Sequence, residues 1–298
     1  MKILITGASG LIGSALTSAL TAQGHTTVSA VRREPRRNDE VRWDPKAGTI
    51  DAHAFDGVDA VVHLAGAGIG DKRWTDAYKK EILESRTLGT RLLAETMAAL
   101  PVKPRVFLSG SAIGIYGARG DESLSETGSE GTGFLADVCR DWEAAAAPAI
   151  SAGIRTVFLR TGIVLSPKGG ALKKQLPLFK LGLGGKFGNG KQWQSWISID
   201  DEVNAIIHLL TSNLSGPVNL TAPTPVTNSD FTKTLASIVS RPALLPIPSF
   251  GPKLLLGGEL ADALLFTGQR VTPNALQSDG YVFAHPTLDV ALRALLKK

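Results

Sequence analysis

The chain has 298 residues, 43% of them hydrophobic and 20% charged, which is enough to bury the large core of a globular protein. Its net charge is +5, but the lysines and arginines are dispersed rather than gathered in one stripe, which argues against nucleic-acid binding and favours small anionic ligands. A single cysteine, Cys139, excludes an internal disulfide, and the chain shows neither a secretory signal nor an apolar run of roughly 20 residues, so we expect a cytoplasmic protein without a membrane partner.

An apolar strand at residues 2–6 opens the chain and runs into the turn Gly7-Ala-Ser-Gly10-Leu-Ile-Gly13. Gly7 suits a tight turn, Gly10 lets backbone amides approach a pyrophosphate, and Gly13 lets the following helix, residues 14–23, pack closely on the sheet. The N-terminus of that helix would face the phosphates with its free N–H groups. We therefore expect a dinucleotide to bind at six residues of this turn: Gly7, Ser9, Gly10, Leu11, Ile12 and Gly13.

The second predicted strand, residues 26–31, ends in Arg32 and Arg33. An acidic residue at this place would bind the ribose 2′-hydroxyl of NAD, whereas an arginine pairs with a 2′-phosphate. The sequence therefore predicts NADP(H) as the cofactor, bound at Arg32 and Arg33, and position favours Arg32 for this role. Because Arg36 and Arg37 continue the basic run, a solvated surface is the alternative.

Further apolar, β-branched runs predict strands at residues 60–64, 105–109, 155–159 and 217–220, with helical patterns at 76–100 and 136–152 between them. Apolar strands joined by crossover helices indicate a parallel sheet covered on both faces. We expect a Rossmann-type, doubly wound α/β fold. Its nucleotide-binding core spans residues 1–165, and residues 166–298 complete the core and form a smaller α/β lobe on the substrate side.

The strand at residues 60–64 ends in Leu64, Ala65 and Gly66. Small residues at the carboxyl end of a strand leave room for a ligand that crosses the edge of the sheet. His63 is expected to pack in the core. The five histidines have no ligand spacing, and we expect no metal.

Several motifs carry a family resemblance. They are Lys80-Glu81-Ile82, Ser85-Arg86, Trp142-Glu143, Arg160-Thr-Gly-Ile-Val-Leu165, Asn219-Leu-Thr-Ala-Pro223 and Gly268-Gln-Arg-Val-Thr-Pro273. With the glycine turn they resemble the extended, epimerase-like short-chain dehydrogenases/reductases. Within these, the chain is similar to the epimerase family proteins with a C-terminal domain of unknown function, here about residues 242–298, which are sometimes labelled cell-division inhibitors.

The resemblance implies that Leu64 and Ala65 line the cofactor and that Glu81 and Arg86 reach it from one helix. Five residues apart, these two side chains lie about 140° apart around the helix, so both can touch an elongated ligand lying across it. The alternative is a surface helix with ordinary charges. Ile163 is expected to pack near the nicotinamide.

The catalytic groups of this superfamily are only partly present. Short-chain dehydrogenases place a serine at the end of a central strand, which Ser111 matches, and a Tyr-x-x-x-Lys pair on the next helix. Counting back from Glu143 puts Leu135 and Cys139 at the tyrosine and lysine positions, and neither can transfer the proton. Tyr116 could supply a phenol beside Ser111, or it could simply pack in its Tyr-Gly turn.

Three functions follow from these residues. The leading one is an NADP(H)-binding oxidoreductase for an unidentified small molecule, with Ser111 and Tyr116 as catalytic candidates. The others are a nucleotide-sugar epimerase and a non-catalytic NADP(H)-responsive binding protein. The glycine-rich segment 182–191 looks like a mobile cover whose Lys186 and Lys191 could meet an anionic substrate, and a homodimer is an open option.

Overall fold

The structure, a computed structural model, describes residues 1–243 and 245–297. Its main feature is an eight-stranded sheet in the order β12-β8-β6-β5-β1-β2-β3-β4. The strands are β1 (Lys2–Thr6), β2 (Thr26–Val31), β3 (Glu40–Asp44), β4 (Thr49–Ile50), β5 (Ala60–His63), β6 (Val106–Ala112), β8 (Arg155–Thr161) and β12 (Gly216–Leu220). All neighbours pair in parallel except β3 and β4. The predicted Rossmann-type sheet and its six predicted strands are confirmed.

The strand order reverses at β1. This strand pairs with β2 on one side and with β5 on the other, so that Thr6 lies opposite both Ala30 and His63. In open α/β sheets, ligands bind outside the carboxyl ends of the strands at such a switch point. The glycine turn follows β1 and the segment 64–66 follows β5, so both predicted cofactor segments lie at this crevice.

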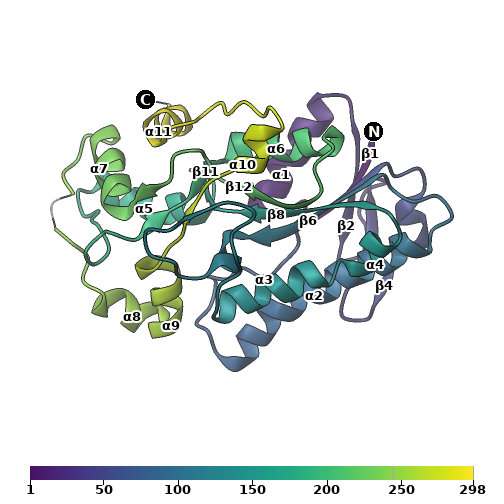
Figure 1. The fold of residues 1–298 in the computed structure, drawn as a ribbon, viewed down its shortest axis with the longest axis horizontal. Coiled ribbons are helices and arrows are strands. Elements are labelled where there is room, and N and C mark those ends of the chain that lie inside the picture. Colours follow the sequence, from purple (N-terminus) through teal and green to yellow (C-terminus); the bar gives the residue numbers. More distant parts are fainter. Residues whose placement is uncertain (244, 298) are drawn as a thin grey trace.

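Helices cover both faces of the sheet (Figure 1). On one face lie α1 (Leu11–Ala22) and α6 (Ile199–Thr211), and on the other lie α2 (Asp76–Ala99), α3 (Phe134–Ala144) and α4 (Ala147–Ser151). The side chains of β1 alternate accordingly. Ile3 and Ile5 belong to the apolar cluster under α1 and α6, and Leu4 belongs to the cluster under α2 and α4. This alternation is the period of a strand buried on both faces.

A third apolar cluster holds the C-terminal lobe together, at the left of Figure 1. It joins α5 (Gly170–Lys180), α7 (Asn228–Ile238) and α11 (Leu288–Leu296) around Trp196, which is completely buried. The other helices are α8 (Phe250–Leu256), α9 (Gly258–Ala261) and α10 (Asn274–Ser278), with single helical turns at Ala52–Phe55, Ile113–Tyr116 and Asp262–Phe266. The short strands are β7 (Ser123–Leu124), β9 (Ile163–Leu165), β10 (Trp193–Gln194), β11 (Trp196–Ser198), β13 (Val226–Thr227) and β14 (Arg270–Val271).

The structure differs from the sequence prediction at one predicted helix and at β3, a strand of the main sheet that was not predicted. The helix predicted at residues 136–152 is two helices, α3 and α4, and Pro148 lies in the first turn of α4, where a residue without an N–H group is tolerated. The strand β3 was not predicted, because charged residues at both ends and in the middle of Glu40–Asp44 hide the buried Trp43. Among the described residues, no helix has the length and apolar character needed to cross a membrane.

Candidate functional site

The glycine turn is packed against the segment that follows β5. Gly7 has a φ of +70°, and a Cβ atom there would lie 2.8 Å from the carbonyl carbon of Leu64. A Cβ atom on Gly13 would lie 2.2 Å from the Gly7 carbonyl oxygen. Helix α1 begins with no side-chain cap and no acidic residue in its first turn. Its N-terminal amides are therefore suited to an anionic group in the crevice.

The two arginines at the end of β2 differ in their contacts. Arg33 donates to both carboxylate oxygens of Glu40, at 2.8 and 2.7 Å. Hydrogen bonds from the Arg33 side chain and the Arg36 backbone lower the pKa of Glu40 to about 2. Arg32 is exposed and makes no hydrogen bond or ion pair with any other described residue. Glu40 belongs to β3, a strand that was not predicted. Its ion pair with Arg33 engages that guanidinium and leaves the Arg32 side chain available to a ligand.

Arg86 is a largely buried cation beside the carboxyl end of β5. Its guanidinium carbon is 5.1 Å from the ring centroid of Trp142, and a Cβ atom on Gly66 would lie 3.3 Å from it. Its Nη1 donates to the Ile82 carbonyl, one turn earlier in α2, at 3.0 Å. Burial lowers the pKa of Arg86, and no carboxylate of the described chain pairs with it. An oxygen-rich or anionic ligand would satisfy this cation.

Glu81 faces a different environment from Arg86. It is exposed, and its carboxylate lies 3.9 Å from the Lys72 ammonium group. Ile163 is half buried in β9, where it pairs with Trp196 of β11. A Cβ atom on Gly169, just before α5, would lie 3.0 Å from Leu11 of the glycine turn. Segments from the core and from the beginning of the lobe thus meet around the turn.

Ser111 lies at the end of β6 in a buried polar network. Its hydroxyl donates to a carboxylate oxygen of Glu143 at 2.6 Å. Arg160 of β8 donates to both oxygens of the same carboxylate, at 2.8 and 2.9 Å. The sequence motifs contained Glu143 and Arg160, but nothing in the sequence assigned them a contact with Ser111.

Tyr116 belongs to the same network and is completely buried. Its hydroxyl donates to Asn219 Oδ1 at 2.8 Å and accepts from Arg160 Nη1 at 3.0 Å. Burial raises the pKa of this phenol. The geometry matches the alternative in which Tyr116 packs in its turn, and a catalytic role for Tyr116 stays a prediction.

Leu135 and Cys139 lie on α3 opposite the turn at Ile113–Tyr116. A Cβ atom on Gly114 would lie 3.4 Å from the Leu135 Cβ atom and 3.8 Å from the Cys139 sulfur. Burial raises the pKa of the Cys139 thiol to about 12, so the thiolate is absent at neutral pH. His63 is also enclosed, and burial lowers its pKa to about 3. None of these side chains can exchange a proton near pH 7.

Glu202 is a buried acid that sequence reasoning missed. It follows two other acids in the first turn of α6, so it resembles a helix-capping residue in the sequence. In the structure it is fully buried and accepts one hydrogen bond, from Thr161 at the end of β8, at 2.9 Å. Its other oxygen has no partner among the described residues. Burial raises the pKa of Glu202 to about 8.

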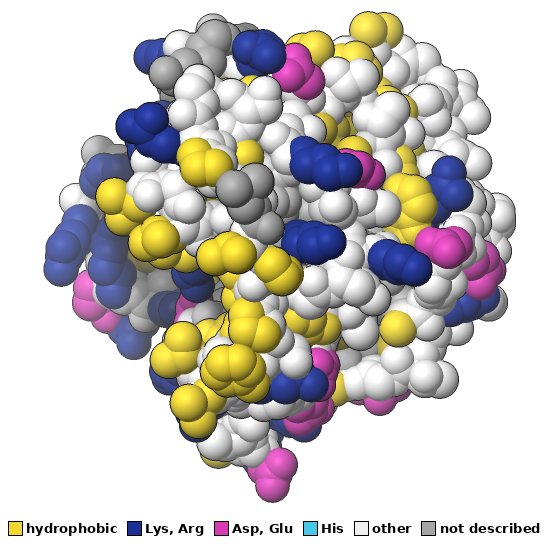
Figure 2. Space-filling view, turned by 90° about the vertical axis from the view of Figure 1, so that its left-hand side faces the viewer, with side chains coloured by type: hydrophobic (Ala, Val, Ile, Leu, Met, Phe, Trp, Pro, Cys, Tyr) yellow, Lys and Arg dark blue, Asp and Glu magenta, His cyan; other side chains and the backbone are white. Residues whose placement is uncertain are grey.

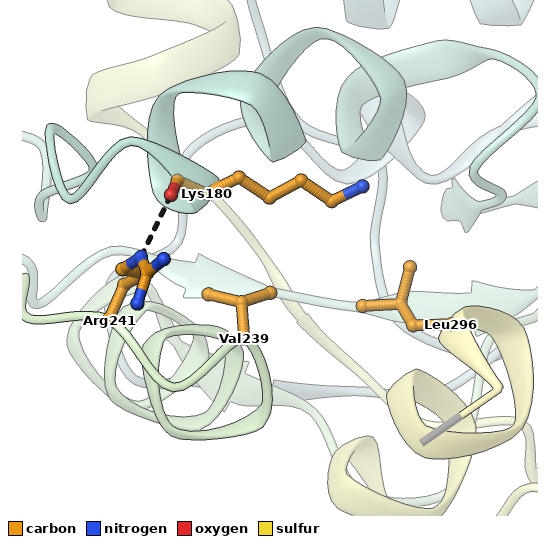
Figure 3. Close-up of a pocket in the computed structure, with 4 residues that line it drawn as sticks. All are labelled: Lys180, Val239, Arg241 and Leu296. Carbon is orange, nitrogen blue, oxygen red and sulfur yellow. Dashed lines mark hydrogen bonds between the residues drawn. The ribbon is translucent and has the colours of Figure 1, made fainter.

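The cavity drawn in Figure 3 is lined by residues of the C-terminal lobe. It has a volume of about 290 Å³ and lies between the ends of α5, α7 and α11. Its lining residues are Lys180, Val239, Arg241 and Leu296, and the Arg241 guanidinium donates to the Lys180 carbonyl at 3.1 Å. None of the predicted site residues lines this cavity.

The sequence matches two family descriptions. Residues 3–221 match the NAD dependent epimerase/dehydratase family, and residues 247–295 match a domain of unknown function, DUF1731. An epimerase family protein of Mycobacterium bovis is 46% identical over 97% of this chain and 96% of its own length. The human epimerase family protein SDR39U1 is 35% identical over 99% of this chain and 100% of its own length.

Solved structures resemble this one over its whole length. A crystal structure of human SDR39U1 with NADPH superposes with a TM-score of 0.91 and 32% identity, covering 100% of both chains. A UDP-glucose 4-epimerase from Thermotoga maritima superposes with a TM-score of 0.78 and 18% identity, which shows the fold alone. From the sequence and structural matches together, the chain belongs to the NAD dependent epimerase/dehydratase family, among the epimerase family proteins that carry the DUF1731 domain.

Proposed function

We propose that the chain binds NADP(H) across the carboxyl ends of β2, β1 and β5 and uses it as an oxidoreductase for a small substrate that is not identified. The observation that carries the cofactor assignment is the contrast between Arg32 and Arg33. Glu40 engages Arg33, whereas Arg32 is exposed and unpaired within the described chain at the position where a 2′-phosphate would lie. The NADPH bound to the human relative supports the same assignment.

The remaining cofactor contacts follow the crevice. The turn at residues 7–13 would bind the pyrophosphate, with Gly13 packed too tightly for any side chain and the amides of α1 directed at the phosphates. The aliphatic part of the Arg33 side chain would contact the adenine end of the cofactor. The nicotinamide half of the cofactor would lie beside residues from three elements: Leu64, Ala65 and Gly66 after β5, Glu81 and Arg86 of α2, and Ile163 of β9.

The nicotinamide would supply the hydride, and the chain's own residues would bind and orient the reactants. Arg86 stays charged at every physiological pH, so it can stabilise a developing negative charge but cannot deliver a proton. Because the Ser111 hydroxyl donates its proton to Glu143, its oxygen would accept a hydrogen bond from a hydroxyl group of the substrate or of the alcohol product. We propose Ser111 as the polar contact to the substrate.

A non-catalytic NADP(H)-binding protein is the second candidate. It is favoured by the buried, fully hydrogen-bonded Tyr116 and by Leu135 and Cys139 at the proton-transfer positions. The same observations weigh against nucleotide-sugar epimerisation, because the usual tyrosine–lysine pair is missing from the sequence.

Cofactor titrations test the first part of the proposal. Calorimetry with NADPH and NADH should show that the wild type binds NADPH more tightly. Arg32→Asp should remove that preference by weakening NADPH binding about 10- to 100-fold. Arg36 is also exposed and lies four residues away, so Arg36→Asp should keep the preference for NADPH. Equal affinity of the wild type for both cofactors would contradict the assignment.

A turnover assay separates the enzyme from the binding protein. Oxidation of bound NADPH would be followed with a panel of aldehydes and ketones, in the wild type and in Ser111→Ala at equal cofactor saturation. If the chain is an oxidoreductase, we expect turnover with at least one carbonyl compound and a turnover rate about 100-fold lower in Ser111→Ala. Tight NADPH binding without turnover on any compound would favour the binding protein.

A further inference from the structure

Apolar side chains are exposed together on one face of the C-terminal lobe (Figure 2). Leu181, Leu183, Phe250, Leu254 and Leu255 are between 67% and 75% exposed. Helix α8 contains no fully buried residue, and its exposed Phe250, Leu254 and Leu255 add little to stability by burial. Isolated exposed apolar residues are ordinary, but a contiguous group of this size marks an interaction surface.

Hydrogen bonds place the two segments that carry these residues side by side. The Ile247 N–H donates to the Lys186 carbonyl at 2.8 Å, and the Gly188 N–H donates to the Ile247 carbonyl at 3.0 Å. Arg241 reaches the Lys180 carbonyl with its guanidinium. We call the surface made by residues 173–191, 241–243 and 245–255 the docking face.

The segments that form the docking face carry cations and no acid of their own. Neither segment 144–199 nor segment 231–258 of the sequence contains an Asp or Glu. The positive side chains of the docking face are Lys173, Lys174, Lys180, Lys186, Lys191, Arg241 and Lys253. Among the described residues only Lys253 of this set pairs with a carboxylate, that of Asp262 at 2.8 Å. Figure 2 shows Lys and Arg side chains interspersed with the apolar ones.

The spacing of the exposed residues combines a cation and apolar side chains on one side of α5 and places two apolar side chains on one side of α8. Lys174, Leu178 and Leu181 follow one another at four- and three-residue intervals at the end of α5, and all three are exposed. In α8, Phe250 and Leu254 are four residues apart. Residues at these intervals share one side of a helix, so the apolar side chains point outward beside the cations.

The charge decides between the possible occupants. A symmetric dimer through this face would bring identical cations opposite one another. Among the described residues only Asp262 pairs with one of them, Lys253, so the other cations would repel one another across the contact. An anionic lipid surface offers the complementary charge, and its headgroup–acyl boundary accepts shallow apolar side chains.

We propose that the docking face binds peripherally to an anionic phospholipid bilayer. Leucine and phenylalanine side chains of α8 and segment 181–183 enter the headgroup–acyl boundary, and the surrounding lysines and Arg241 contact lipid phosphates. No spanning helix is required, so the expectation of no membrane partner, which considered only long apolar runs, does not extend to this surface.

Vesicle cosedimentation tests the proposal with the full chain. The wild type should sediment with vesicles of equal phosphatidylglycerol and phosphatidylcholine at low salt, bind at least tenfold more weakly to phosphatidylcholine alone, and dissociate as salt is raised. The variant Leu254→Ser/Leu255→Ser and the variant Lys173→Glu/Lys174→Glu should each weaken binding at least tenfold. Val102→Ser and Lys103→Glu, an exposed apolar residue and an exposed lysine far from this face in the sequence, should bind as the wild type does.

Three results would overturn the proposal. The first is a wild type that does not sediment with anionic vesicles. The second is binding that Leu254→Ser/Leu255→Ser leaves unchanged while its NADPH affinity and thermal unfolding equal those of the wild type. The third is a dimer, seen by light scattering, that only the docking-face variants convert to a monomer, because the face would then bind a second copy. NADPH binding is measured separately, so a failure here leaves the proposed function intact.

Discussion

Arg160 and Glu143 form a two-point ion pair, with both carboxylate oxygens accepting from the same guanidinium at 2.8 and 2.9 Å. Their side chains are only 6% and 11% exposed. The pair links β8 to α3, and it holds Ser111 of β6, whose hydroxyl donates to Glu143 Oε1, the oxygen that also accepts from Arg160 Nε. The orientation of the proposed substrate contact therefore depends on residues in three separate elements.

Replacing Arg160 by methionine should strongly destabilise the protein. The change keeps much of the side-chain volume but leaves the Glu143 carboxylate buried without its cation, at a cost of about 3–5 kcal/mol of unfolding free energy. Urea unfolding measures this difference. Arg140→Met removes an exposed arginine that pairs with Glu130 and Asp137, and it should cost no more than about 1 kcal/mol. An equal loss of unfolding free energy in the two variants would mean that the buried ion pair contributes no more to stability than the exposed one.

Tyr116→Phe separates packing from chemistry. The variant removes the hydroxyl that Asn219 and Arg160 contact, so we expect a loss of about 1–3 kcal/mol of unfolding free energy. If Tyr116 only packs, NADPH affinity and turnover should be those of the wild type at temperatures where the variant is folded. A large loss of turnover in a folded variant with full NADPH affinity would instead show that the phenol takes part in the reaction.

Glu202 should make stability depend on pH. Its pKa is raised from 4.5 to about 8 in the folded protein, so the native state keeps a proton that the unfolded chain releases. Stability should therefore fall as pH rises from about 5 to about 8, by up to about 1.4 kcal/mol per pH unit, and level off above that range.

Glu202→Gln should flatten this slope, because the amide does not titrate. Denaturant unfolding at pH 5, 6, 7 and 8 gives the comparison with the wild type. Glu95→Gln, on the exposed side of α2, serves as the matched control and should leave the slope unchanged. A wild type and a Glu202→Gln variant with the same slope would show that the buried carboxyl is not the responsible group.

Gly13→Ala should damage the cofactor turn. The added methyl group would lie 2.2 Å from the Gly7 carbonyl oxygen, so the turn or α1 must shift, at a cost of about 1–3 kcal/mol. We expect NADPH affinity to fall at least tenfold in calorimetry. Gly251→Ala adds the same methyl group in α8, where nothing lies within 4 Å, and should leave affinity unchanged.

Part of the site was accessible from the sequence because its signals are local. The apolar strand, the spaced glycines and the following helix lie within 23 residues of one another, and their backbone requirements select residue types directly. The same is true of the six predicted strands, whose uninterrupted β-branched runs reflect burial on both faces.

The partners of individual side chains were not accessible, because they depend on which segments fold together. The pairing of Arg33 depends on Glu40, whose strand β3 has no clear sequence pattern. Glu202 is indistinguishable from a capping acid until α6 packs against the sheet and removes its carboxyl from water.

By itself, then, the sequence determined the family, the Rossmann-type sheet and the crevice for a dinucleotide, because periodicity and glycine spacing act through the local backbone. Only the tertiary structure decided that Arg33 pairs with Glu40, how Ser111 is held and which face of the lobe is left apolar and cationic. Ion pairs and burial join residues tens to hundreds of positions apart, and their free energy depends on distances that no local pattern contains.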